Sequence, residues 1–241
     1  RATKGKSTMN FLSLEGNESI TSVLPMPKNV KESSVSLIMV TKEGTAKKVA
    51  AKNFHDVRRS GLIAIKLAPS KRGEGKGDEL ISASFAEKGD EVVLVSQKGQ
   101  SIRFKESDIR EMGRSAAGVR AVKLGKGDGV VNASVVKKGA EGAEVLVLAS
   151  LGYGKKTNLK EYKVQKRGGS GIKTAKLTTK TGDIIAAQVV YGEEGEIVAI
   201  SKKGQVIRVD LTEIPSLGRQ TQGVRIMKLR AGDGLAGLIC L

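Results

Sequence analysis

The chain has 241 residues, enough to bury a sizeable core in one domain or two, and its 42 Lys and Arg against 25 Asp and Glu give a formal charge of +17. This excess of positive charge predicts a polyanionic partner. The sequence contains no basic amphipathic helix, membrane-length apolar run or signal peptide. We therefore expect a cytoplasmic protein whose partner is a nucleic acid rather than a membrane. One cysteine (Cys240) and one histidine (His55) exclude an internal disulfide, a Cys or His metal site and a Ser-His-Asp triad.

The first 30 residues contain part of a repeat that is complete elsewhere. The basic turn Arg1-Ala2-Thr3-Lys4-Gly5-Lys6 is followed by Gly16-Asn17 and by an apolar segment from Ile20 that we expect to be a strand. Because the chain starts at Arg1 and not at Met, we also expect it to be a fragment of something longer.

Three features recur in a fixed order along the rest of the chain. The first is an apolar run, a turn that ends in Gly and a short basic run, which together predict a β-hairpin. Its four copies are residues 37–48, 92–103, 145–156 and 197–208.

The second feature is a basic turn that closes on Gly, followed by a strand with a central lysine. The turns are residues 58–61, 114–118, 167–171 and 219–223. The strand lysines, which we interpret as structural or solvated, are Lys66, Lys123, Lys176 and Lys228. The third feature is a Gly-Asp turn before an apolar strand, and its aspartates are interpreted as turn residues rather than metal ligands. These turns are residues 77–78, 127–128, 182–183 and 232–233.

The spacing of the copies predicts the fold class. Gly44, Gly99, Gly152 and Gly204 lie 55, 53 and 52 residues apart. A unit of about 50 residues built from short strands is typical of propeller blades. The helix-like pieces, at 51–57, 106–112 and 212–217, are short and are expected to be turns on one rim. We therefore predict an all-β, propeller-like single domain over residues 1–241, with a partial blade at 1–30 and complete blades at about 31–88, 89–142, 143–194 and 195–241.

The cations near the glycine turns are the candidate phosphate ligands. The segment from Gln165 to Gly171 is the richest of these turns, because glycine permits positive φ and close backbone approach, and cations at such a bend suit a phosphate. One basic site per blade would follow a curved duplex without reading bases. The first candidate set lies in and after the basic turns: Arg1, Lys4, Lys6, Arg58, Arg59, Arg114, Arg120, Gln165, Lys166, Arg167, Gly168, Gly169, Gly171, Lys173, Arg219 and Arg225. The second set follows the hairpin turns: Lys47, Lys48, Arg103, Lys155, Lys156 and Arg208.

Several runs of residues resemble the C-terminal domain of the DNA gyrase A subunit. The runs are Val95 to Lys105 with Met112-Gly113-Arg114 and Gly118-Val119-Arg120, then Gly152 to Thr157, and Gly218 to Arg225. The resemblance extends from Arg1 to the C-terminus, with several motifs in the family's order and spacing. The related topoisomerase IV domain is less regular and usually has degenerate blades, so gyrase is the preferred resemblance and topoisomerase IV the alternative.

The resemblance implies a β-pinwheel, a propeller-like ring in which neighbouring blades exchange a strand and whose basic rim wraps double-stranded DNA with positive handedness. Such wrapping presents a DNA segment for passage and lets gyrase introduce negative supercoils. No catalytic residue, metal or cofactor is implied in this chain, since ATP and Mg belong to the holoenzyme. The implied partners are the gyrase B subunit with the rest of the gyrase A subunit in an A2B2 type II topoisomerase of the bacterial cytoplasm, associated with the nucleoid.

The chain departs from the family pattern in two ways. The family has six blades, and this chain would start after the first and most of the second. The family's Gln-Arg-Arg-Gly-Gly-Lys-Gly box lies in that first blade, whereas the similar segment Gln165 to Gly171 falls in the fifth blade of the family's order. Either the protein carries a second box-like loop or the family's register is shifted here.

Three other functions are weighed against DNA wrapping. A protein-interaction scaffold would have a weaker net charge and more exposed aromatic residues, whereas aromatic residues are 3% here and Trp is absent. The same scarcity argues against a platform for stacking single-stranded bases. A hydrolase or lyase propeller would repeat His, paired carboxylates or metal ligands, which this chain does not. RNA binding stays open, because phosphate contacts distinguish duplexes poorly.

Overall fold

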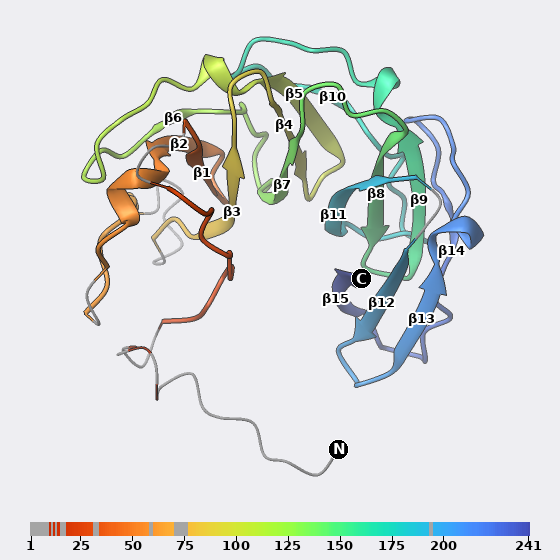
Figure 1. Ribbon diagram of the computed structural model, residues 1–241. Coiled ribbons are helices and arrows are strands. Elements are labelled where there is room, and N and C mark those ends of the chain that lie inside the picture. Colours follow the sequence, from red (N-terminus) through yellow and green to blue (C-terminus); the bar gives the residue numbers. More distant parts are fainter. Residues whose placement is uncertain are drawn as a thin grey trace.

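The computed structural model describes residues 10, 12, 14, 18–30, 34–57, 60–69, 77–192 and 195–241. Four antiparallel sheets follow one another along an open, C-shaped arc (Figure 1). The hairpins are β1 (Ser36–Thr41) with β2 (Thr45–Ala50), β4 (Glu91–Ser96) with β5 (Gln100–Lys105), β8 (Ala143–Ala149) with β9 (Tyr153–Asn158), and β12 (Glu196–Ser201) with β13 (Val206–Asp210). The return strands are β3 (Leu80–Ala86), β7 (Val130–Val136), β11 (Ile184–Tyr191) and β15 (Leu235–Cys240). Three two-residue strands complete the set: β6 (Val119–Arg120), β10 (Ile172–Lys173) and β14 (Val224–Arg225).

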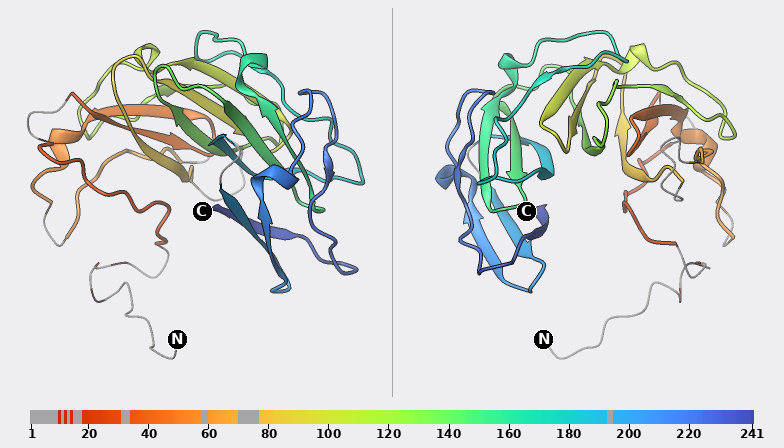
Figure 2. Two further views of the ribbon diagram at one scale, coloured as in Figure 1. Left: turned by 45° about the vertical axis from the view of Figure 1, so that its right-hand side comes forward. Right: turned by 180° about the vertical axis from the view of Figure 1, so that it is seen from behind.

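Neighbouring repeats exchange a strand. The sheet orders are β3-β1-β2-β6, β7-β4-β5-β10 and β11-β8-β9-β14, so each hairpin pairs with its own return strand on one side and with a short strand of the next repeat on the other. The return strands pack against one another on the inside of the arc, and the short strands lie on the outside (Figures 1 and 2). We call residues 119–124, 172–177 and 224–229, which begin with these short strands, the exchange segments. The predicted all-β, propeller-like pinwheel is confirmed.

Apolar side chains from adjacent sheets form three main cores between the blades. Buried strand residues join the first sheet to the second, the second to the third and the third to the fourth. The first core includes Val40 and Leu94, the second Val95 and Val147, and the third Leu148 and Ile197. Each of these three cores draws on two repeats, as expected for a repeat architecture. A smaller cluster around Met39, Val49 and Phe54 lies within the first repeat.

The last sheet differs from the other three. Its order is β13-β12-β15, and in the described part of the chain no exchange segment covers β13. Gly152, in the third hairpin turn, has φ +83°, and a Cβ there would overlap the carbonyl oxygen of Met227 in the adjoining exchange segment. Gly204, the equivalent residue of the last hairpin, has φ +80° but nothing within 4 Å of a Cβ position. The positive φ of the turn therefore favours glycine at both positions. At Gly152, packing against the exchange segment also leaves no room for a side chain.

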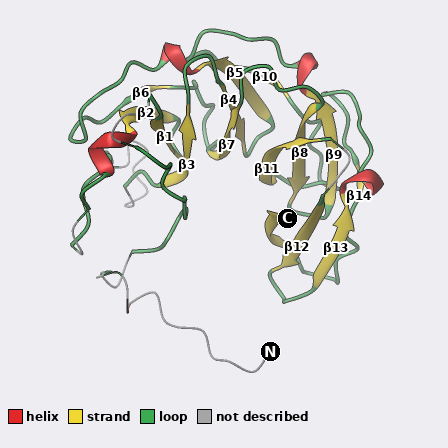
Figure 3. Ribbon diagram, viewed as in Figure 1, coloured by secondary structure: helices red, strands yellow, loops and turns green. Residues whose placement is uncertain are grey.

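Short 3-10 helices follow the second strand of each hairpin and lie on the outside of the arc (Figure 3). They are η2 (Ala51–Phe54), η3 (Glu106–Asp108), η4 (Leu159–Glu161) and η5 (Leu211–Glu213). The strand predicted from Ile20 is wrong, because residues 18–27 form no ladder and the Thr21 hydroxyl only donates to the carbonyl of Leu80 (3.3 Å). No helix in the described ranges is long and apolar enough to cross a membrane.

Candidate nucleic-acid interface

Each exchange segment begins with the outermost strand of one sheet, and each of these three strands carries an exposed cation at the same position. Arg120 ends β6, Lys173 ends β10 and Arg225 ends β14, and all three side chains are exposed. The guanidinium of Arg225 lies 5.6 Å from the ring centroid of Tyr153 and donates to the Tyr153 hydroxyl (3.2 Å). Three residues of the first candidate set therefore lie on the outer edges of successive sheets.

The arginines of two basic turns bond to the main chain of the preceding repeat. Arg167 donates from Nε to the carbonyl of Asp108 (2.7 Å) and from Nη1 to the carbonyl of Arg120 (2.9 Å). Arg219, at the equivalent position, donates from Nη1 to the carbonyl of Lys173 (2.8 Å). These guanidinium groups therefore hold the preceding exchange segment in place.

The box-like turn from Gln165 to Gly171 is joined closely to the second repeat. The Gln165 N–H donates to the carbonyl of Arg103 (2.7 Å), and the Gly168 N–H donates to the carbonyl of Ala121 (2.6 Å). Lys166 is exposed, whereas Arg167 is half-buried and engaged as described above. The turn thus presents one cation to solvent and uses the other to hold the fold.

Three of the six cations that follow the hairpin turns are buried, which contradicts the prediction that they contact DNA. Lys47, Lys155 and Lys156 expose 0%, 1% and 5% of their surface. The physical reason is strand exchange: the second strand of each of these hairpins is covered by the exchange segment and basic turn of the next repeat. The ammonium group of Lys156 pairs instead with Glu144 (3.2 Å).

The ammonium groups of Lys47 and Lys155 bond to carbonyl oxygens of the next repeat's basic turn. Lys155 donates to Gly218 (2.5 Å) and Arg219 (2.7 Å), and Lys47 donates to Arg114, as well as to a carbonyl of its own repeat. Burial lowers the pKa of Lys155 to about 8 and lowers that of Lys47 as well. These two lysines position the turns that follow them.

The other three cations of this set pair with glutamates. Lys48 pairs with Glu106 at 2.6 Å, Arg103 pairs with Glu91 at 2.5 Å, and Arg208 pairs with Glu196. Lys48 and Arg103 expose 13% and 18% of their side chains, whereas Arg208 exposes 66% because nothing in the described structure covers β13. Covered Lys48 and Arg103 are therefore poorly placed for the predicted DNA contact.

Comparison of the four repeats could have predicted that Lys47 and Lys155 are buried, although their charge suggested exposure. Ile102 and Ile207 occupy the hairpin position of Lys47 and Lys155 in the other two repeats. An apolar residue at the same position in half of the copies indicates a side chain that points into the protein.

Five predicted residues lie outside the described residues: Arg1, Lys4, Lys6, Arg58 and Arg59. Arg114 is half-buried, and its carbonyl accepts from Lys47. Among the described candidates, exposed Arg120, Lys173 and Arg225 lie on three successive sheets.

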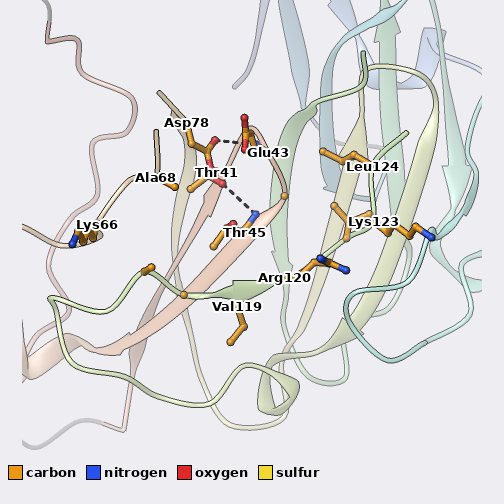
Figure 4. A pocket seen from close by; sticks show the side chains of 14 residues that line it. Thr41, Glu43, Thr45, Lys66, Ala68, Asp78, Val119, Arg120, Lys123 and Leu124 are labelled. Atoms are coloured by element: carbon orange, nitrogen blue, oxygen red, sulfur yellow. Dashed lines mark hydrogen bonds between the residues drawn. The ribbon is translucent and has the colours of Figure 1, made fainter. Parts of the chain in front are cut away.

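A pocket of about 540 Å³ opens between the first hairpin turn and β6 (Figure 4). On one wall, the Asp78 carboxylate accepts from the backbone N–H of Glu43 (2.9 Å), which is a turn-stabilising role. On the other side, Arg120 and Lys123 extend away from the pocket (Figure 4). In the described ranges, no group of three His, Cys, Asp or Glu side chains could hold a metal ion.

Antiparallel sheets that exchange strands around an arc, with cations on their outer strands, define a β-pinwheel, a class of propeller-like domain. A family model described as the DNA gyrase C-terminal domain, a beta-propeller, matches residues 1–25, 36–70, 90–137, 143–190 and 195–241. The chain belongs to this family.

Relatives and solved structures agree with this assignment. The chain is 37% identical to the DNA gyrase A subunit of Staphylococcus epidermidis, over 97% of this chain and 25% of that protein, and 37% identical to that of Escherichia coli, over 99% and 26%. A solved gyrase A C-terminal domain matches with a TM-score of 0.81 and 25% identity, over 98% of this chain and 75% of that one. The C-terminal domain of a topoisomerase IV matches in fold, with a TM-score of 0.86 and 21% identity over 98% and 70%. The chain spans about a quarter of the length of these curated gyrase relatives.

Proposed function

We propose that this domain binds duplex DNA along its outer strands and wraps it around the arc. The observation that carries the proposal is the recurrence of an exposed cation at the same position on the outermost strand of three successive sheets. Duplex DNA carries one charge about every 1.7 Å of its axis, and each neutralised phosphate releases counterions. A curved row of cations on a chain of net charge +17 offers a path rather than a pocket.

The relatives extend this proposal to an assembly. As the C-terminal part of a gyrase A subunit, the domain would work with the rest of that polypeptide and with the gyrase B subunit in an A2B2 complex, where wrapping gives direction to strand passage and negative supercoiling. ATP and Mg would act elsewhere in that assembly, in the bacterial cytoplasm. The domain itself would contribute no catalytic residue and no cofactor.

Two alternatives are separated from wrapping by one titration. Long and short duplexes are each titrated with the 241-residue chain at increasing salt, together with a structured RNA of equal length. Wrapping predicts tighter binding to the long DNA duplex and a steep loss of affinity with salt. Binding that ignores duplex length and salt would favour a protein-interaction scaffold, and an equal preference for RNA would contradict a DNA-specific role.

A further inference from the structure

Two of the three exchange segments contain a bulge directly after their two-residue strand. In the first, the N–H groups of Ala121 and Val122 both donate to the carbonyl of Gly44, at 2.8 and 3.4 Å. In the third, the N–H groups of Ile226 and Met227 both donate to the carbonyl of Gly152, at 2.8 and 3.1 Å. Two residues facing one partner is the arrangement of a β-bulge.

The bulge changes which side chains face outward. In a regular strand, residues i and i+3 point to opposite faces. Here the two residues between them both turn inward, as Ala121 and Val122 do with 0% and 4% exposure. The residues on either side, Arg120 and Lys123, are both exposed and extend in the same direction (Figure 4).

The second exchange segment repeats the same pattern of burial. Thr174 and Ala175 are buried, and the Thr174 N–H donates to the carbonyl of Gly99 (2.9 Å). The flanking residues Lys173 and Lys176 are both exposed. In each segment, therefore, two cations three residues apart are both exposed, and their Cα atoms are at most about 10 Å apart along an extended chain.

We propose that each exchange segment is a two-cation phosphate clamp on the wrapped duplex, and that the second cation of each pair binds DNA as the first does. The inference rests on the proposed function and adds a row of contacts to it. We name the second cations the clamp lysines; they are Lys123, Lys176 and Lys228. The ligand is the phosphodiester backbone of a DNA duplex, and the two cations of a pair would reach different phosphates.

None of the six clamp cations is neutralised within the described part of the chain. No carboxylate there forms an ion pair with any of them. The paired cations are Arg120 with Lys123, Lys173 with Lys176, and Arg225 with Lys228. Exposed charges without an internal counter-charge are available to an external polyanion.

Hydrogen bonds between repeats connect the clamps into one path. The Lys123 N–H donates to the carbonyl of Gly169 (2.8 Å), and the Lys176 N–H donates to that of Thr221 (3.0 Å). Arg167, from the turn that contains Gly169, donates back to the carbonyl of Arg120. The first two clamps are thus fixed to the basic turn of the following blade, so the clamps follow one another along the arc.

The test compares two double variants that remove the same charge. The clamp variant is Lys123→Gln with Lys176→Gln, and the control is Lys88→Gln with Lys138→Gln, two exposed lysines in the turns that precede β4 and β8. The measured quantity is the slope of log affinity against log salt for a long duplex. Each lost phosphate contact reduces that slope by about 0.9, so the clamp variant should lose nearly two units and the control almost none. Lys123→Arg with Lys176→Arg should restore the slope.

Thermal unfolding confirms that the variants fold, and the outcomes separate the two proposals. If the parent chain wraps DNA but the clamp variant keeps the parent slope, the clamp lysines do not bind phosphate and this inference is overturned. If the slope falls equally in the clamp and control variants, the loss reflects the lower net charge rather than specific phosphate contacts, and the inference is also overturned. If the parent chain shows no length preference and no salt dependence, the proposed function itself fails.

Discussion

Two rows of cations follow glycines in this domain, and they differ in what covers them. The cations after the hairpin turns lie on β2, β5 and β9, which the next repeat covers, and they are buried or paired with glutamate. The cations of the exchange segments lie on the outermost strands and face solvent. Arg208 supports this explanation, because it occupies the hairpin row on uncovered β13 and exposes 66% of its side chain, against 6% for its equivalent Lys156.

The comparison teaches that the order of strands in the sheet, rather than residue type, decides the role of each cation. A lysine or arginine on the second strand from outside stabilises the join between blades. The same residue on the outermost strand is available to a ligand. The predictions below test this division, from the largest expected effect to the smallest.

The covered and uncovered hairpin turns should differ most when glycine is replaced. Gly204→Ala should cost about 1–2 kcal/mol of stability, because only the positive φ is strained. Gly152→Ala should cost about 3 kcal/mol or more, because the new methyl group also displaces the Met227 carbonyl. Urea unfolding of both variants measures the difference. Equal losses would mean that the exchange segment does not pack on Gly152.

The repeated arginine–glutamate pair offers a second contrast. Arg103→Gln should cost about 2–3 kcal/mol, because Glu91 and the carbonyls of Leu159 and Tyr162 lose a partner in a covered site. Arg208→Gln should cost much less than Arg103→Gln, since its pair is exposed. Thermal unfolding with calorimetry compares the two. A larger loss at Arg208 would contradict the assignment of β13 as an uncovered strand.

Lys155 should make stability depend on alkaline pH. Its folded pKa of about 8 lies below its ordinary value, so the unfolded chain binds more protons between pH 8 and 10 and stability should rise with pH in that window. Relative to Lys155→Met, the parent chain should gain about 2 kcal/mol between these two pH values. Urea unfolding of both proteins is measured across this pH range, and the difference between their free energies of unfolding removes the contribution of other titrating groups. Parallel curves would show that Lys155 titrates as a solvated lysine.

The two cations of the box-like turn should separate stability from binding. Arg167→Ala should cost about 1–2 kcal/mol, because two charge-assisted hydrogen bonds to carbonyls are lost. Lys166→Ala should change stability by less than about 0.5 kcal/mol and reduce the salt slope of DNA binding instead. A loss of stability at Lys166 with unchanged DNA binding would reverse these roles.

Much of the fold could be predicted from the sequence because the same pattern of strands and turns occurs four times. Apolar runs before Gly44, Gly99, Gly152 and Gly204 indicated the hairpins, and their spacing indicated blades. Strand exchange entered only through the resemblance, because β6, β10 and β14 are two residues long and their partners lie in another repeat. Pairings this short have no periodicity of their own in the sequence.

The candidate site was predicted less completely than the fold. Exposed Arg120, Lys173 and Arg225 lie where a basic rim requires them, but Lys47 and Lys155 were assigned to that rim from charge alone and are buried. The clamp lysines were interpreted as structural or solvated because they lie inside the predicted strands. Alternation in a regular strand would place them on the face opposite the cations three residues before them. Only the bulge, which is set by the contact with the previous hairpin turn, brings them to the outer face.

The most direct measurement is the linking number of circular DNA. A nicked plasmid is closed by ligase with increasing amounts of the 241-residue chain, and the topoisomers are resolved on a gel. If outward-facing cations bend the duplex around the arc, the distribution should shift with positive sign in proportion to bound protein, and less so for the clamp variant. Saturated binding with an unshifted distribution would show that DNA lies on the domain without encircling it, which would contradict the account.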